Sequence, residues 1–197
     1  MRIVLASESA ARKRLLAGAG VEFATDPAGI DEAALKHACR ERKESAAECA
    51  LTLARAKAAR VAERQHGALV IGADQILELD GAWLDKPRDL ADARAQLARL
   101  RGKGHALVTA AVVMAGRELL WRQVVTARLV MRRFSDAFLD RYLAAMGERA
   151  LRTVGAYELE GLGAQLFAEV EGDYFAILGL PLLPLLAFLR DKGALSS

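Results

Sequence analysis

The sequence predicts an α/β fold in which helices flank a mixed central sheet. Residues 1–5 and 68–73 are short apolar runs with the length of buried strands, and a long helical pattern at residues 46–63 lies between them. Two further runs, residues 106–114 and 118–131, join through a short turn as antiparallel strands do. Early alternation of strand and helix, followed by antiparallel strands, is typical of a mixed sheet.

The first elements follow from local capping signals. After the strand at residues 1–5, Ser7 and Ser9 stand where helix N-caps are favoured. The helix that follows takes in Arg12 and ends at Gly18 and Gly20. The opening unit is therefore predicted as strand, polar turn and helix.

The next segment carries carboxylates beside predicted elements. A loop leads to the acidic pair Asp31 and Glu32, and residues 46–63 contain no Gly or Pro, which favours a long helix. Asp74 lies at the carboxyl end of the second buried strand. The turn pair Asp80-Gly81 then predicts a hairpin that leads into a loop.

The later elements are predicted from periodicity and turn residues. They are a helix at residues 90–100, the two long strands, a helix capped by Ser135 that runs to about Met146, a strand around residues 165–170 and a last helix at residues 181–192. No repeat or linker marks a boundary, so residues 1–197 are predicted to form one domain with two lobes.

Composition limits the class of protein. The chain has 197 residues, 53% hydrophobic and 27% charged, so it can bury a large core without a disulfide or a metal. Its two cysteines, Cys39 and Cys49, suit a reducing cytoplasm and lack the spacing of a structural zinc site. The first apolar stretch is too short for a signal peptide or a membrane anchor, so we expect a cytoplasmic protein without membrane contact.

Several catalytic motifs are absent. The sequence has no GxxxxGK[ST] phosphate loop, no GxGxxG after a strand, no GxSxG and no HExxH. The histidines His37, His66 and His105 are isolated, and we interpret each as a surface or packing residue.

Polar residues at turns remain as candidates. Ser7, Ser9 and Arg12 lie where a strand leads into a helix, and the free N–H groups of a helix N-terminus beside a guanidinium can bind phosphate. The alternative is a capped helix with an exposed arginine.

Carboxylates and lysines could complete such a site. Asp74 follows an apolar strand, at the end where α/β sheets bind ligands, and Asp31 and Glu32 add further oxygen ligands for a divalent cation. Lys57 and Lys86 could each neutralise phosphate charge. The alternatives are a charge at a helix start for the acidic pair and ordinary solvated lysines.

The chain as a whole resembles the Maf family of nucleotide pyrophosphatases, and the similarity extends almost end to end. Seven separated blocks carry it in order. They are LASESAARKRLL at 5–16, IDE at 30–32, ARAKA at 54–58, IGADQ at 71–75, LDKPRDLADARAQLARLRGKGHALVTA at 84–110, GAYELEGLGAQL at 155–166 and EGDYFAILGLPL at 171–182.

The resemblance implies a fold, a reaction and residue roles. It implies an inosine-triphosphatase-like α/β fold, usually homodimeric, with two lobes around a cleft. It also implies hydrolysis of a nucleoside triphosphate to the monophosphate and pyrophosphate with a divalent metal, Mg or Mn. By matching position, Asp74 would activate water and Glu32 would help Asp74 to hold the metal. The triphosphate would be bound by Ser7, Arg12, Lys57 and Lys86.

Three positions sort with base preference in the family. The branch that prefers thymidine and uridine triphosphates carries Arg, Thr and Gln, and the 7-methyl-GTP branch carries Trp, Gln and Glu. This chain has Ala11, Gln75 and Glu160, so two positions match the second branch, although Ala11 lacks a ring to stack on a cationic purine. Since a carboxylate only accepts hydrogen bonds and guanine offers two neighbouring donors, we expect a guanine-type or modified purine. The alternative is dTTP or UTP.

A rival class is a nucleic-acid-binding regulator of cell division. A sequence pI near 9.0 and arginines such as Arg128, Arg132 and Arg133 suggest it, whereas a net charge of +3 over 197 residues is weak support. The acidic residues are interspersed and aromatic residues make up only 6% of the chain, which is unlike a basic surface that stacks bases. We therefore expect no stable nucleic-acid partner.

Overall fold

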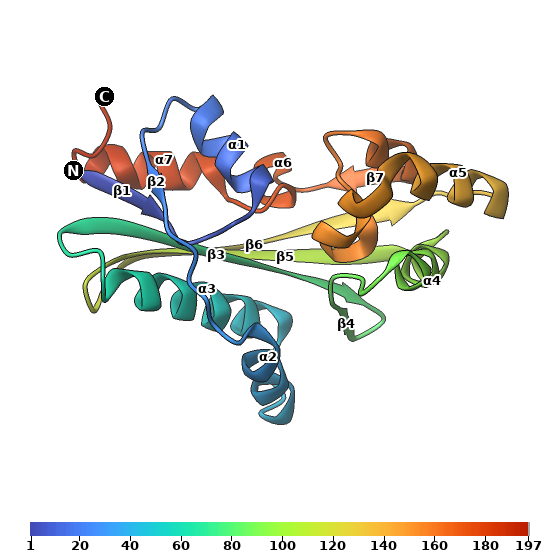
Figure 1. Ribbon diagram of the computed structural model, residues 1–197, viewed down its shortest axis with the longest axis horizontal. Coiled ribbons are helices and arrows are strands. Elements are labelled where there is room, and N and C mark those ends of the chain that lie inside the picture. Colours follow the sequence, from blue (N-terminus) through green and yellow to red (C-terminus); the bar gives the residue numbers. More distant parts are fainter. Residues whose placement is uncertain (197) are drawn as a thin grey trace. The chain divides into compact units, whose positions relative to one another are not determined.

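The computed structural model describes residues 1–196 and divides into two compact units (Figure 1). Unit 1 contains residues 1–75, 109–125 and the chain from residue 173 on, and unit 2 contains residues 76–108 and 126–172. The mixed α/β fold class is confirmed. That the whole chain forms one domain stays a prediction.

In unit 1 the parallel part of the sheet is built on β1 (Arg2–Leu5). This strand pairs in parallel with β2 (Ala24–Thr25) on one side and with β3 (Ala68–Leu79) on the other. Leu5 lies opposite Ile71, so β3 continues past the end of its neighbour. The sheet order is β2-β1-β3-β5-β6-β7, and β4 also pairs with β3.

Two long strands continue the sheet beyond β3. They are β5 (Gly104–Ala115) and β6 (Glu118–Met131), joined by a turn at residues 116–117. Like β3, each has residues in both units. The buried residues of β5 are almost all apolar. The strand β6 is more exposed, and many of its residues are polar or half-buried.

Helices cover both faces of the sheet in unit 1 (Figure 1). One face carries α1 (Ala10–Gly18) and α7 (Leu182–Asp191), and the other carries α3 (Ala46–Ala62) with α2 (Glu32–Glu41) packed against it. The short helix α6 (Tyr174–Ile177) precedes α7. These helices make the two faces of β3 different environments.

Side chains of β3 alternate between those environments, as a strand requires. Leu69, Ile71 and Ala73 belong to the apolar core shared with α1 and α7, which also includes Leu16 and Leu185. The even-numbered positions therefore face α3. The alternation decides which way each polar residue of β3 points.

Close contact between α3 and β3 depends on Gly72. A Cβ atom built on Gly72 would lie 2.8 Å from both the backbone nitrogen and the Cβ of Ala58, and closer still to the carbonyl oxygen of Ala54. The small side chains of Ala54 and Ala58 form the facing surface of the helix. Only glycine at position 72 allows the two backbones to approach this closely.

Unit 2 contains the ends of the long strands with two short ones. The strand β4 (Ala82–Leu84) pairs antiparallel with β3 through a turn at Asp80-Gly81, and β7 (Phe167–Glu171) pairs antiparallel with β6. Two helices, α4 (Leu90–Leu100) and α5 (Asp136–Met146), pack on one another. Three 3₁₀ helices lie between α5 and β7. They are Gly147–Arg152, Val154–Ala156 and Leu162–Leu166.

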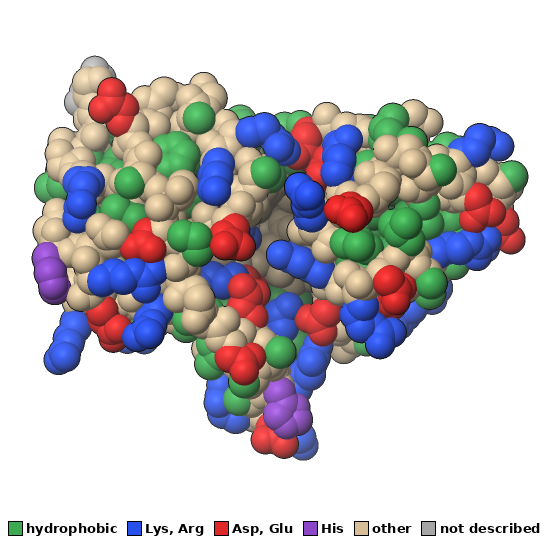
Figure 2. Space-filling view, in the orientation of Figure 1, with side chains coloured by type: hydrophobic (Ala, Val, Ile, Leu, Met, Phe, Trp, Pro, Cys, Tyr) green, Lys and Arg blue, Asp and Glu red, His purple; other side chains and the backbone are tan. Residues whose placement is uncertain are grey.

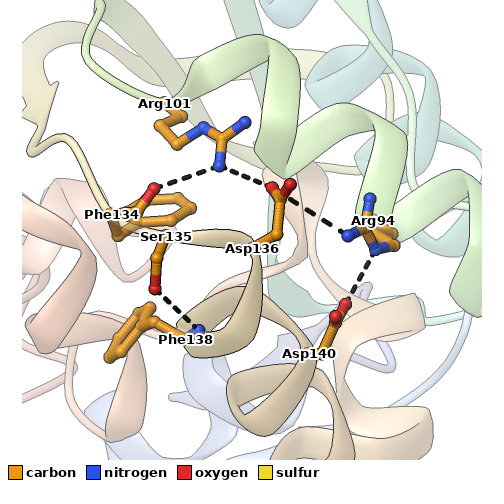
Figure 3. Close-up of polar contacts among 7 residues, drawn as sticks. All are labelled: Arg94, Arg101, Phe134, Ser135, Asp136, Phe138 and Asp140. Atoms are coloured by element: carbon orange, nitrogen blue, oxygen red, sulfur yellow. Dashed lines mark hydrogen bonds and ion pairs between the residues drawn. The ribbon is translucent and has the colours of Figure 1, made fainter.

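Ion pairs join α4 to the start of α5 (Figure 3). Arg101 donates to the carbonyl oxygen of Phe134 at 3.0 Å and to Asp136 at 2.7 Å, and Arg94 donates to Asp140 at 2.8 Å. Ser135 accepts a hydrogen bond from the backbone of Phe138 at 3.2 Å, which confirms it as the predicted N-cap.

The three histidines are surface or packing residues, as predicted. His37 and His66 are exposed, and His105 lies in the core of unit 2, only 3% exposed. Its Nε2 atom is 2.8 Å from the Tyr157 hydroxyl, and its ring contacts that of Phe167. Burial lowers the pKa of His105 to about 4, so this ring is neutral at pH 7.

Most predicted elements are confirmed, with several corrections. The helix at residues 90–100 coincides with α4, and those at 46–63 and 181–192 agree with α3 and α7 to within a residue. The buried strand does not end at residue 73. It runs to Leu79, because β4 continues its pairing, and Asp74 therefore lies within the strand. The sequence patterns also do not predict α2, β2, α6 or the three 3₁₀ helices, and the strand expected around residues 165–170 begins only at Phe167, because Leu162–Leu166 forms a 3₁₀ helix.

The surface agrees with the predicted mixture of charges. On the face shown in Figure 2, Lys and Arg side chains are interspersed with Asp and Glu. None of the helices formed by residues 1–196 combines the length and the apolar character needed to cross a lipid bilayer.

We predict that Gly72→Ala destabilises the protein by about 1–3 kcal/mol, because the added methyl group forces α3 away from β3. Urea unfolding followed by circular dichroism measures the change. The matched control is Gly18→Ala in α1, where an added Cβ meets nothing within 4 Å. Equal stability of the two variants would show that the close approach is unimportant.

Candidate functional site

The candidate site begins where β1 leads into α1. The Ser7 hydroxyl oxygen accepts hydrogen bonds from the backbone of Ser9 at 3.2 Å and from Nη1 of Arg12 at 3.1 Å. Ser9 is the N-cap of α1 and accepts from the backbone of Arg12 at 3.4 Å. Only one of the two serines predicted at cap positions therefore caps the helix, and the other orients the arginine.

Arg12 is a buried cation, only 8% exposed. Its Nε donates to the carbonyl oxygen of Gly179 at 2.9 Å. Gly179 has a φ of 108°, and a Cβ there would lie 3.1 Å from the same Nε. Both the backbone conformation and the space require glycine at this position.

The charge of Arg12 interacts with the carboxylates nearby. Burial lowers the pKa of the Arg12 guanidinium, while the negative charges of Asp74 and Glu32 oppose that shift. Ser7 and Gly179 occupy two of the five N–H groups that a guanidinium carries. Further donors therefore remain for an anion.

Lys57 joins two carboxylates in the same unit. Its ammonium Nζ forms ion pairs with Oδ1 of Asp74 and, at 2.9 Å, with Oε1 of Glu32. Lys57 and Asp74 are 7% and 5% exposed, whereas Glu32, the first residue of α2, is exposed. Asp74 faces α3 because it lies two residues after Gly72 on the same face of β3.

The second oxygen of Asp74 has no such partner. Oδ2 is buried, and within the described chain no group donates a hydrogen bond to it. A buried carboxylate oxygen is an acceptor whose solvation has been lost, so it needs a proton donor or a cation. Oδ2 of Asp74 is therefore available to accept a proton or to bind a cation.

The structure includes no group of three or more His, Cys, Asp or Glu side chains arranged to hold a metal among residues 1–196. Two carboxylates, those of Glu32 and Asp74, form ion pairs with the same lysine, Lys57. Asp31 caps α2, accepting from the backbone of Ala34 at 2.9 Å. The alternative interpretation of a charge at a helix start therefore holds for Asp31.

Gln75 follows Asp74 and points to the opposite face of β3. Its Nε2 atom donates to the hydroxyl oxygen of Thr109 at 2.8 Å and to the carbonyl oxygens of Ala176 at 3.1 Å and Ile177 at 3.0 Å. The side chain is partly exposed. Its hydrogen bonds therefore join it to α6 and β5, on the face that carries α1.

The three remaining candidate residues lie in three different segments of the chain. Ala11 is half-buried on α1, next to Arg12. Lys86 and Glu160 belong to unit 2, where Lys86 is exposed in the loop after β4 and Glu160 is exposed before the 3₁₀ helix at Leu162–Leu166. The negative charge of Glu160 contributes to a raised pKa of Arg149, after the larger effect of Glu158.

Unit 1 thus brings six of the predicted residues together, and two others join them that the sequence analysis does not single out. The six are Ser7, Arg12, Glu32, Lys57, Asp74 and Gln75. The two additions are Gly179, which accepts from Arg12, and Thr109, which accepts from Gln75. Both lie inside blocks that carry the family resemblance, which is the one signal that could have found them.

The fold and the site define a class. This is a mixed α/β protein in which two buried cations and an incompletely satisfied carboxylate lie where a parallel strand pair ends, an arrangement suited to a phosphorylated ligand. The family described as Maf-like proteins matches residues 2–192. The chain belongs to that family.

Relatives that are named for an activity align over nearly the full chain. A protein of Granulibacter bethesdensis named nucleoside triphosphate pyrophosphatase is 51% identical over 100% of both chains. Another of that name, from Paramagnetospirillum magneticum, is 52% identical over 98% of this chain and 99% of its own. A protein of Rhizobium meliloti named 7-methyl-GTP pyrophosphatase is 48% identical over 99% and 98%.

We predict that Lys57→Met destabilises the protein by roughly 3 kcal/mol, because it leaves Asp74 buried without its ion pair. Urea unfolding at pH 7 measures the loss. The double variant Lys57→Met with Asp74→Leu removes both buried charges and is expected to recover at least half of it. No recovery in the double variant would show that Lys57 stabilises by packing instead of by charge.

Proposed function

We propose that the protein is a nucleoside triphosphate pyrophosphatase, a hydrolase that cleaves the bond between the α- and β-phosphates and releases pyrophosphate. The observation that carries the proposal is the buried Asp74, in which Oδ1 is paired with Lys57 and Oδ2 has no partner among residues 1–196. Full-length relatives named for this activity support it. Such an enzyme would remove unwanted nucleotides from the cellular pool.

Each residue of unit 1 then has a role that its contacts allow. Asp74 accepts a proton from the attacking water at Oδ2, while Lys57 holds Oδ1 and fixes the carboxylate. Arg12, oriented by Ser7 and the Gly179 carbonyl, offers its remaining N–H groups to the triphosphate. Positioning and neutralisation of charge are the main contributions that a protein makes to phosphoryl transfer.

The residues also fit a divalent cation, Mg or Mn. Glu32 and Asp74 would hold it, since both supply the hard oxygen ligands that these ions prefer. Oδ2 of Asp74, which lacks a partner within residues 1–196, has two lone pairs, one for the ion and one for the proton of the water. Mg²⁺ usually keeps several waters and binds substrate phosphates, so two carboxylates suffice. When bound, the ion would neutralise phosphate charge and polarise the reacting phosphoryl group.

We further propose roles for the two residues of unit 2 and for the specificity positions. Lys86 would bind the triphosphate, and Glu160 would accept hydrogen bonds from the two neighbouring donors of guanine. Gln75 and Glu160 match the branch that prefers 7-methyl-GTP, and relatives at 48% and 47% identity carry that name. Ala11 offers no ring for stacking, so the preference would rest on hydrogen bonds.

The oligomeric state, the cellular compartment and the absence of a stable nucleic-acid partner are further parts of the proposal. We propose that the protein is a cytoplasmic homodimer. The family resemblance supports the dimer, and Cys39 and Cys49, both free and buried, suit a reducing compartment. A nucleic-acid partner has little support, because Arg132 stacks on Phe138, 4.4 Å from its centroid, and donates to the Gln165 carbonyl.

We predict that Asp74→Asn folds normally yet loses at least about 100-fold in hydrolysis rate, because the amide cannot accept the proton. Steady-state pyrophosphate release measures the rate, and circular dichroism checks the fold. The control is Asp191→Asn, an exposed carboxylate at the end of α7, which should keep the wild-type rate. Wild-type activity in Asp74→Asn would remove Asp74 from the role of general base.

A panel of nucleoside triphosphates tests the proposed function and its base preference. We expect pyrophosphate release with Mg²⁺ or Mn²⁺, its loss with EDTA, and faster turnover of GTP or 7-methyl-GTP than of dTTP and UTP. Faster turnover of dTTP or UTP would reverse the base preference while leaving the activity in place. The absence of pyrophosphate release from every nucleotide would contradict the enzyme itself.

A further inference from the structure

The amide of Gln75 lies against three oxygen atoms. Two are the carbonyl oxygens of Ala176 and Ile177, and the third is the hydroxyl oxygen of Thr109, a residue only 1% exposed. A carbonyl oxygen can only accept hydrogen bonds. The hydroxyl of Thr109 has one hydrogen, which it donates to the Ala176 carbonyl oxygen at 2.8 Å.

This environment accepts only one orientation of the amide. With Nε2 facing the three oxygens, each contact joins a donor to an acceptor. With the amide turned over, Oε1 of Gln75 would lie about 3 Å from two carbonyl oxygens, and the contacts would become repulsive. The two carbonyl oxygens of α6 therefore select which end of the amide faces away from the protein, and Thr109, which bonds both Nε2 and the Ala176 carbonyl oxygen, holds the amide against them.

The end that faces away is the carbonyl oxygen. Within residues 1–196, every hydrogen bond of the Gln75 side chain involves Nε2. Oε1 accepts none of them, and it is not one of the buried atoms left without a partner. Oε1 of this partly exposed residue is thus open to a ligand.

Gln75 lies close to the groups that bind phosphate in the proposed function. It follows Asp74 in β3, and α6, which holds its Nε2, leads within two residues to Gly179, the acceptor for Arg12. One short segment, residues 176–179, therefore orients both Gln75 and Arg12 through backbone carbonyls.

We propose that Thr109 is a positioning residue that makes Gln75 a hydrogen-bond acceptor toward the base. The substrate class is then a nucleotide whose base presents an N–H at this position, such as the N1–H or 2-amino group of guanine or the N3–H of uracil. A base without a donor on that edge leaves Oε1 unpaired. The proposal deepens the proposed function and depends on it.

The test compares two purine nucleotides that differ in donors. GTP carries N–H groups on the pairing edge of its base, and purine ribonucleoside triphosphate carries none. In Thr109→Val, which keeps the shape and loses the hydroxyl, the ratio of kcat/KM for GTP to that for the purine nucleotide should fall roughly threefold to tenfold. Thr109→Ser keeps the hydroxyl and should retain the wild-type ratio.

Because both kcat/KM values are measured on the same variant, any general loss of stability or of hydrolysis rate affects both and cancels in their ratio. UTP and its analogue without N3–H, 2-pyrimidinone ribonucleoside triphosphate, provide the same comparison if pyrimidines prove better substrates. An independent readout is the side-chain NH₂ signal of Gln75 in ¹⁵N NMR spectra. Its exchange with water should be slow in the wild type and in Thr109→Ser, and faster in Thr109→Val.

The outcomes separate the two proposals. An unchanged ratio in Thr109→Val, or an equal fall in Thr109→Ser, would overturn the positioning role while hydrolysis itself remains. A fall in this kcat/KM ratio together with faster NH₂ exchange, both in Thr109→Val and not in Thr109→Ser, would support the positioning role of Thr109. If the wild type hydrolyses no nucleotide, the proposed function fails, and the NMR comparison still decides whether Thr109 fixes the amide.

Discussion

The arrangement of the candidate site depends on burying Lys57 between two carboxylates. An ammonium group removed from water is costly unless opposite charges surround it, and Asp74 and Glu32 provide them. The contact requires α3 to lie almost directly on the backbone of β3, which the absent side chain of Gly72 permits. The helix packing and the chemistry of the site therefore share one geometric condition.

Local patterns in the sequence predict most of the fold. The helix α4 is predictable because its apolar residues recur at helical spacing and glycines follow it. The helix α2 is missed although Leu35, Ala38 and Cys39 recur at helical spacing, because the acidic pair at its start is interpreted as the end of a loop. The course of β3 past Asp74 depends on pairing with β4, which no local signal at residue 74 reveals.

The site is predictable as a set of residues and much less so as a set of contacts. Capping preference places both Ser7 and Ser9 at a helix start, and only the structure shows that one of them orients Arg12. The hydrogen bond from Arg12 to Gly179 joins residues 167 positions apart. Contacts of that kind arise from chain topology, so residue type and spacing cannot specify them.

Consecutive positions in a strand point to opposite faces, and the structure places Asp74 and Gln75 in this relation. Under the proposed roles, the general base Asp74 and the residue that binds the nucleotide base, Gln75, have separate surroundings. Asp74 contacts α3, and Gln75 contacts α6. Substitutions that change the surroundings of Gln75 and leave the Gly179 carbonyl in place for Arg12 could therefore change the nucleotide that is accepted without altering the hydrolytic centre. Such modularity would let relatives diverge in substrate while the reaction stays constant.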